Sequence, residues 1–120
     1  MLRVKETDDS LNAEITDAKI LDEGTILQTG KELMDLLPRS AGKRILVNFR
    51  RVQFMSSAMI GKLVLLNKQS KAAEVELKFC SISPNVLEVF KITRLNKVFK
   101  IVTDEEKALK DFKGGGGWFG

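Results

Sequence analysis

The sequence contains no histidine, no tyrosine and a single cysteine, and these absences exclude several kinds of chemistry. Without histidine, neither Ser-His-Asp nor Cys-His catalysis is available, and zinc cannot be held by imidazole ligands. Cys80 has no partner for an internal disulfide, and its place at the end of an apolar strand pattern predicts a buried, inert thiol. A phosphate-binding glycine loop is also missing. We therefore expect no enzyme, no metal site and no cofactor.

Long apolar runs are missing as well. No run approaches the roughly 18 residues that a membrane span needs. The first residues lack the basic-then-apolar order of a signal peptide, so a cytoplasmic protein without a membrane association is expected. The 120 residues are 43% hydrophobic and 30% charged, which suits one domain with a substantial core.

The net charge of +4 is unevenly distributed along the chain. Residues 1–40 hold five Lys/Arg against nine Asp/Glu, and residues 41–120 hold fifteen against seven. Such asymmetry can mark a nucleic-acid surface. Here the basic residues are scattered singly and few aromatic side chains are available to stack on bases. A solvated basic face without direct nucleic-acid binding is favoured, and it could equally serve an acidic protein partner.

The hydrophobic patterns predict the element order β-β-α-β-α-β-α-β-α. Helices between strands require crossover connections, which favours parallel pairing and an α/β fold, whereas a turn at 7–10 lets the first two strands pair as a hairpin. We expect a mixed sheet of about five strands with about four helices packed mainly on one face. The strands are expected at 2–5, 13–21, 44–49 (central), 74–79 and 98–102, and the helices at 25–37 (closed by Pro38), 57–71, 84–91 and from Thr103. Residues 1–113 form the predicted domain and 114–120 a glycine-rich flexible tail.

The stretch 43–68 contains the point where strand spacing changes to helical spacing. Ile45, Leu46 and Val47 form an apolar run typical of a strand buried on both faces, and helical spacing begins after Ser56 and Ser57. Serine is a favoured N-cap, so one of these two serines is expected to cap the helix. We place the candidate functional site at this junction.

Four stretches, in this order, resemble the STAS domain family of bacterial anti-sigma factor antagonists. The segment Phe54-Met-Ser-Ser-Ala-Met-Ile-Gly61, which follows Leu46-Val-Asn-Phe49, is similar to the family's hallmark F-M-D-S-S-G-L-G. The other three stretches are Ile20–Asp22, Ser81–Pro84 with Val86, Val89 and Phe90, and Ile92–Leu95 with Val98–Ile101. The resemblance covers about residues 1–112 and implies the STAS fold.

The resemblance also implies partner switching. Family members of this type bind an anti-sigma factor, a serine kinase of the histidine-kinase ATPase superfamily, and thereby release the sigma factor. The kinase phosphorylates a serine that corresponds here to Ser57, with Ser56 as the alternative, and a serine phosphatase reverses the modification. The expected partner-binding residues are Asp22, Ser56, Ser57, Met59 and Lys62.

Three residues at the site depart from the family pattern. Ser56 stands where the family has Asp, Ala58 where it has Ser or Thr, and Met59 where it has Gly. These departures leave open a second interpretation, a STAS scaffold or a sensor of a small ligand such as a nucleotide or lipid, without phosphorylation. They also leave open that the two serines only cap the helix.

Overall fold

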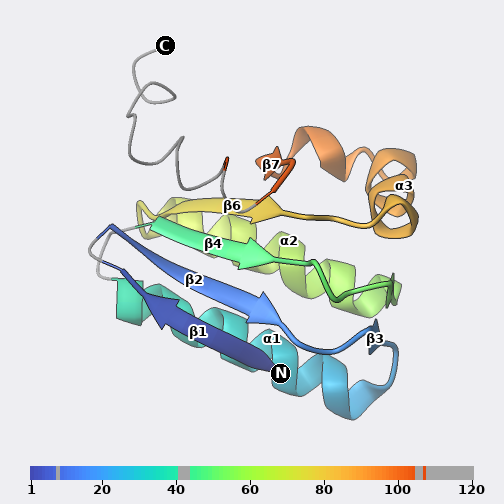
Figure 1. Cartoon of the computed structure of the whole chain (residues 1–120), viewed down its shortest axis with the longest axis horizontal. Coiled ribbons are helices and arrows are strands. Elements are labelled where there is room, and N and C mark those ends of the chain that lie inside the picture. Colours follow the sequence, from blue (N-terminus) through green and yellow to red (C-terminus); the bar gives the residue numbers. More distant parts are fainter. Residues whose placement is uncertain (8, 41–43, 105–106, 108–120) are drawn as a thin grey trace.

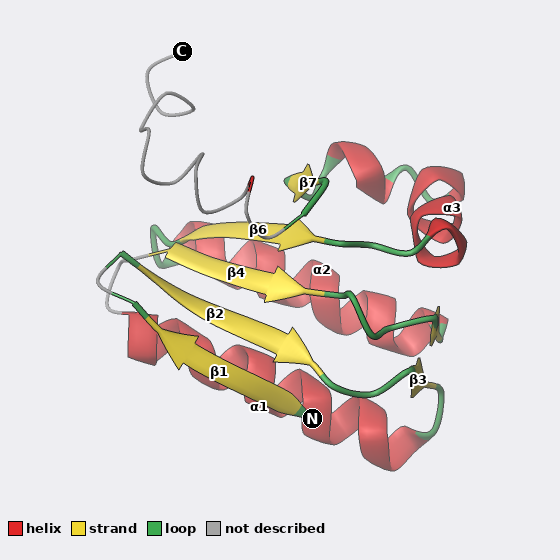
Figure 2. Ribbon diagram, viewed as in Figure 1, coloured by secondary structure: helices red, strands yellow, loops and turns green. Residues whose placement is uncertain are grey.

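The computed structural model describes residues 1–7, 9–40, 44–104 and 107. Within these ranges the chain forms an α/β fold (Figures 1 and 2). The strands are β1 (Leu2–Glu6), β2 (Ser10–Ile15), β3 (Lys19–Ile20), β4 (Arg44–Asn48), β5 (Phe54–Met55), β6 (Glu76–Cys80) and β7 (Ile101–Val102). The helices are α1 (Glu23–Ser40), α2 (Ser57–Ala72), α3 (Pro84–Ile92) and the short 3-10 helix η1 (Leu95–Lys97). No helix in the described part of the chain is long and apolar enough to span a membrane.

Five strands form one mixed sheet in the order β1-β2-β4-β6-β7. The hairpin strands β1 and β2 are antiparallel, and the pairs β2–β4, β4–β6 and β6–β7 are parallel, as crossovers through helices require. The strand β4 is central, and Ile45 and Val47 are fully buried within it. The predicted fold class and the central position of this strand are confirmed.

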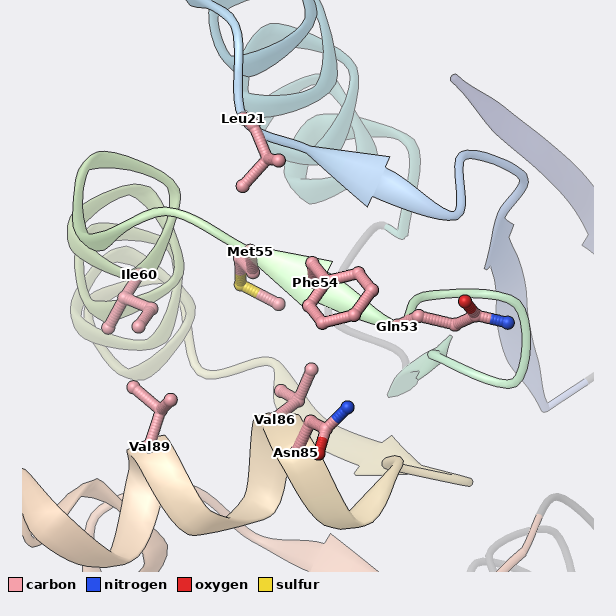
Figure 3. Close-up of a pocket in the computed structure, with 8 residues that line it drawn as sticks. All are labelled: Leu21, Gln53, Phe54, Met55, Ile60, Asn85, Val86 and Val89. Atoms are coloured by element: carbon pink, nitrogen blue, oxygen red, sulfur yellow. The ribbon is translucent and has the colours of Figure 1, made fainter.

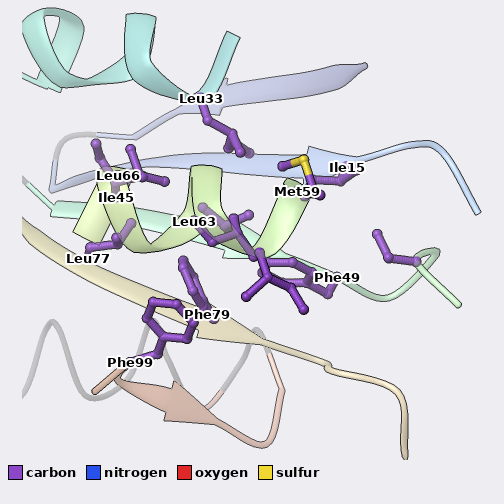
Figure 4. Close-up of a cluster of buried hydrophobic side chains, with 14 of the residues drawn as sticks. Ile15, Leu33, Ile45, Phe49, Met59, Leu63, Leu66, Leu77, Phe79 and Phe99 are labelled. Atoms are coloured by element: carbon purple, nitrogen blue, oxygen red, sulfur yellow. The ribbon is translucent and has the colours of Figure 1, made fainter. Parts of the chain in front are cut away.

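The core lies between the sheet and the helices α1 and α2, which cover one of its faces (Figure 1). From α2, Met59, Leu63 and Leu66 point at the sheet and are 0% exposed (Figure 4). An aromatic cluster closes the core near β7, where the ring centroid of Phe79 lies 5.1 Å from that of Phe49 and 4.8 Å from that of Phe99. Cys80 is buried, as the sequence predicts.

The predicted second strand, 13–21, is in fact two strands with a break after Ile15. The bond from the Thr16 N–H to the Met1 carbonyl is the last backbone bond that the described residues make between this segment and the β1 side. Two residues later the Ala18 carbonyl accepts from Gln53 and Phe54, so the chain has changed its pairing partner. After the turn, β3 pairs in parallel with β5 in a separate two-stranded sheet. This short ribbon brings together the segments that lead into α1 and α2.

Outside the predicted second strand, two boundaries differ from the prediction by three residues, and the other described boundaries by at most two. The helix α1 continues past Pro38 to Ser40, because a proline in the last turn removes only one backbone donor and Ser40 Oγ donates to the Leu37 carbonyl at 2.7 Å. The predicted strand at 98–102 is shortened to β7, since the N–H groups of Val98 and Phe99 bond the Leu95 carbonyl and extend the η1 turn. The predicted helix from Thr103 and the predicted tail at 114–120 lie largely or wholly outside the described residues.

Candidate functional site

The N-terminus of α2 is capped by Ser56. Its backbone is extended, with φ −80° and ψ 164°, and its Oγ accepts the backbone N–H of Met59 at 3.3 Å. The Ser56 carbonyl accepts the first intrahelical bond, from the N–H of Ile60, at 3.1 Å. Of the two serines that the sequence offers as caps, Ser56 therefore takes this role.

Ser57 is the first residue of α2, and its side chain is exposed. Because Ser56 serves as the cap, the Ser57 hydroxyl is left without a hydrogen bond to any described residue. The sequence predicts this placement at an open helix start. A free hydroxyl at the positive end of a helix is accessible to modification, and the helix would stabilise an anion attached there.

Asp22 lies at the corresponding point of the other helix. Its carboxylate accepts the Thr25 backbone N–H at 3.0 Å and the Thr25 hydroxyl at 2.7 Å, so it caps the start of α1. These two hydrogen bonds, the side-chain one first, hold the pKa of the exposed Asp22 carboxyl below its ordinary value. In the β3–β5 ribbon Ile20 pairs with Met55, so Asp22 and Ser57 each follow that pair by two residues. The register thus brings Asp22 to the same end of the molecule as Ser57.

The expectation that Met59 contributes to a docking surface is wrong, because this side chain is 0% exposed. Met59 follows Ser57 by two residues, which is a rotation of about 200° around a helix. If Ser57 faces solvent, Met59 therefore faces the sheet, where it packs in the core (Figure 4).

Lys62 is half-buried because its side chain packs against α1. A Cβ added at Gly30 would lie 3.1 Å from Lys62 Cδ, so the aliphatic part of this lysine covers the glycine where the two helices approach each other. Lys62 remains available at the surface, but much of its side chain serves the α1–α2 contact.

An apolar groove that the sequence did not reveal lies beside the start of α2. It has a volume of about 240 Å³ and is formed between the β3–β5 ribbon, α2 and α3 (Figure 3). Its lining is apolar except for Gln53 and Asn85, and the apolar members are Leu21, Phe54, Met55, Ile60, Val86 and Val89. Leu21 and Phe54 are 53% and 45% exposed, and both line this groove, so together they form an exposed apolar patch. Both residues belong to stretches that resemble the STAS family, but nothing in the sequence indicated that they line a common groove.

We expect Ser56→Ala to lower the free energy of unfolding by about 1 kcal/mol, because the Met59 N–H would lose its acceptor. Ser57→Ala should change it by less than about 0.5 kcal/mol, because this hydroxyl bonds to no described residue. Urea unfolding of the two variants measures the difference. Equal losses would contradict the assignment of Ser56 as the cap.

Comparisons with known proteins bear on the family and the fold of the chain. The sequence profile described as "STAS domain" matches residues 8–108 of the chain. BtrV of Bordetella bronchiseptica, which is named as an anti-sigma factor antagonist, is 31% identical over 71 residues. That match covers 59% of this chain and 61% of BtrV, so it extends over less than two thirds of the relative's length.

Solved structures share the fold. A domain protein from Planctomyces limnophilus described as an anti-sigma-factor antagonist (STAS) superimposes with a TM-score of 0.81 at 20% identity, covering 93% of this chain and 97% of the other. The anti-sigma factor antagonist SpoIIAA in its unphosphorylated form gives a TM-score of 0.76 at 22% identity, with coverage of 95% and 97%. The Bacillus SpoIIAA structure is also known in a phosphorylated form, with a TM-score of 0.68 at 20% identity and coverage of 92% and 97%.

Proposed function

The chain belongs to the STAS domain family, and we propose that it acts as an anti-sigma factor antagonist whose binding to an anti-sigma factor is switched at Ser57. The observation that carries the proposal is that the two serines have different structural roles. Ser56 alone caps α2, and Ser57 is exposed with a free hydroxyl. A kinase can therefore modify Ser57 without removing the capping hydrogen bond.

A phosphate on Ser57 is compatible with the fold. Among the described residues, the backbone N–H groups of Ser57 and Ala58 have no acceptor, which is usual at the start of a helix. Together with the helix dipole they favour a nearby anion. Phosphorylation therefore adds about −1.5 to −2 charges to the surface without unfolding α2.

The surroundings of Ser57 explain how this charge would release a partner. Ile60, one turn further along α2, lines the apolar groove, and Leu21 and Phe54 expose apolar surface on its other side. A partner that covers this surface removes water from around Ser57. A phosphate there would have to lose its hydration without a compensating cation, which costs several kcal/mol and ejects the partner.

Gly61 supports docking at this end of α2. Glycine in a helix interior costs about 1 kcal/mol relative to alanine. Nothing lies within 4 Å of a Cβ built at Gly61, so packing within the described chain does not require a glycine there. A glycine here would let another protein approach the backbone of α2 closely, without a side chain in between.

The departures from the family pattern have different consequences in the structure. Ser56 replaces an aspartate but keeps the capping role, since both residues are good N-caps, and it removes one negative charge. Met59 replaces a glycine but is buried, so it leaves the docking surface unchanged. Ala58 is exposed, so this departure also alters the surface next to Ser57, where it removes a hydroxyl. It is the observation that favours the second candidate, a STAS scaffold or small-ligand sensor without phosphorylation, for which the apolar groove would be the ligand site.

On the first candidate function, the partner is an anti-sigma factor that is also a serine kinase of the histidine-kinase ATPase superfamily, and a serine phosphatase restores binding. This switching takes place in the cytoplasm, where sigma factors act. It involves no direct contact of this chain with nucleic acid.

The experiment that tests this function is phosphorylation by the organism's own anti-sigma kinases with ATP, read by intact mass. We expect the chain to gain one phosphate at Ser57, and Ser57→Ala to gain none. Ser56→Ala is the matched control and should still be modified, because Ser57 remains exposed. If no kinase modifies the folded wild-type chain, the unswitched scaffold or sensor is the better interpretation.

A further inference from the structure

The face of the sheet that α1 and α2 leave uncovered carries a polar hollow of about 260 Å³. In Figure 1 this face is toward the viewer, and among the described elements no helix lies in front of β1, β2 and β4. The sheet register places side chains of the three strands in adjacent rows. The polar lining comprises Arg3, Lys5, Asn12, Glu14, Asn48 and Arg50.

Each acceptor group in the hollow already has a donor from the chain. The Glu14 carboxylate accepts from the Arg50 guanidinium at 2.5 Å. Asn48 Oδ1 accepts the backbone N–H of Arg50 at 2.8 Å, and Asn12 Oδ1 accepts the Ser10 hydroxyl at 3.0 Å. A ligand would therefore find few open acceptors here.

Apart from Arg50, the side-chain donors of the hollow are free of partners among the described residues. Asn12 and Asn48 are only 8% and 6% exposed, yet the side-chain NH₂ group of each has no acceptor among the described residues. Arg3 and Lys5 likewise form no ion pair or side-chain hydrogen bond within the described ranges. Positive charges on the edge strand β1 could serve only to discourage strand pairing between molecules. That role does not involve the two amides. Neither NH₂ nitrogen is among the fully buried unpaired atoms of the described residues, so water reaches both in the hollow, and a ligand with acceptor oxygens could replace that water.

We propose that this hollow binds a small phosphate-bearing molecule. The charged lining consists of the three cations Arg3, Lys5 and Arg50 and one carboxylate, Glu14, for a net charge of +2. A phosphate monoester carries about −1.5 to −2 charges near neutral pH and offers three strong acceptor oxygens. The negative charge of the phosphate matches the net positive charge of the hollow, and its three oxygens can accept from the free donors. A carboxylate carries a smaller charge and has one oxygen fewer. The volume is near the lower end of ligand pockets, about 300 Å³.

This site is separate from the proposed switch. The hollow lies on the open face of the sheet, and α2 with Ser57 lies behind the opposite face (Figure 1). Binding here does not depend on an anti-sigma factor or on phosphorylation of Ser57. A failure of either proposal would leave the other standing.

The test is an NMR titration of the ¹⁵N-labelled full chain with inorganic phosphate, with sodium chloride added to keep the ionic strength constant because exposed charges are screened by salt. We expect saturable shifts of the side-chain NH₂ signals of Asn12 and Asn48. In the double variant Arg3→Gln/Lys5→Gln the half-saturating phosphate concentration should rise at least tenfold. Both residues are exposed, so the variant should keep the wild-type backbone spectrum.

The matched control is Lys68→Gln/Lys71→Gln, which removes the same charge from the exposed surface of α2 and should leave phosphate binding unchanged. The proposal is overturned if the two amide signals do not saturate, or if sodium acetate moves them as much as phosphate does. It is also overturned if the two double variants bind phosphate equally. Binding of a poly-glutamate peptide without phosphate binding would assign this face to an acidic protein partner instead.

Discussion

Ser57→Asp is expected to weaken binding to the anti-sigma partner at least about 100-fold while leaving the fold intact. A carboxylate at the first residue of α2 is favoured by the helix dipole, so the free energy of unfolding should stay the same or rise slightly. Inside an interface that covers the apolar groove, the same carboxylate is desolvated without a partner, a cost of about 3 kcal/mol or more. Calorimetric titration with the partner and urea unfolding measure the two effects separately.

The matched control for this charge change is Gln69→Glu, which adds one negative charge to the exposed surface of α2 roughly 18 Å along the helix from Ser57. It should leave binding unchanged, and Ser57→Ala should bind like the wild type. If Ser57→Asp binds the partner as tightly as the wild type, the proposal that a negative charge at Ser57 controls binding is wrong. The unswitched scaffold or sensor would then be the function to pursue.

Phe79→Ala is expected to lower the free energy of unfolding by about 3–5 kcal/mol. Phe79 is 1% exposed, and its ring packs against Phe49 and Phe99 with centroid distances of 5.1 and 4.8 Å. Its removal loses the transfer free energy of the ring and leaves a cavity between β6 and its neighbours. Because small domains are stable by only about 5–15 kcal/mol, the variant should be near the limit of folding.

Phe54→Ala is the matched control for the loss of a phenyl ring. Phe54 is 45% exposed at the edge of the apolar groove, so its removal should cost less than about 1 kcal/mol in stability. If the groove is the docking surface, this variant should still bind its partner more weakly. Urea unfolding distinguishes the two phenylalanines, and equal losses of stability would contradict the core assigned here.

The sequence alone determined much of the fold. The apolar run at Ile45–Val47 predicted a strand buried on both faces, and it became the centre of the sheet. The change of period at Ser56 and Ser57 predicted the start of α2 to within one residue. These features are local, because periodicity and capping depend on residues a few positions apart. The resemblance to the STAS family rested on the same local stretches.

Only the tertiary structure decided what each side chain of the site can do. It separated the capping Ser56 from the exposed Ser57, and it placed Met59 in the core although all three are neighbours in the sequence. The apolar groove exists because β3 pairs with β5 and α3 packs beside them, and the polar hollow exists because the register of β1, β2 and β4 aligns their side chains. Such contacts join residues far apart in the chain, and a shift of register by one residue would turn each of these side chains to the other face. The local sequence pattern does not specify them.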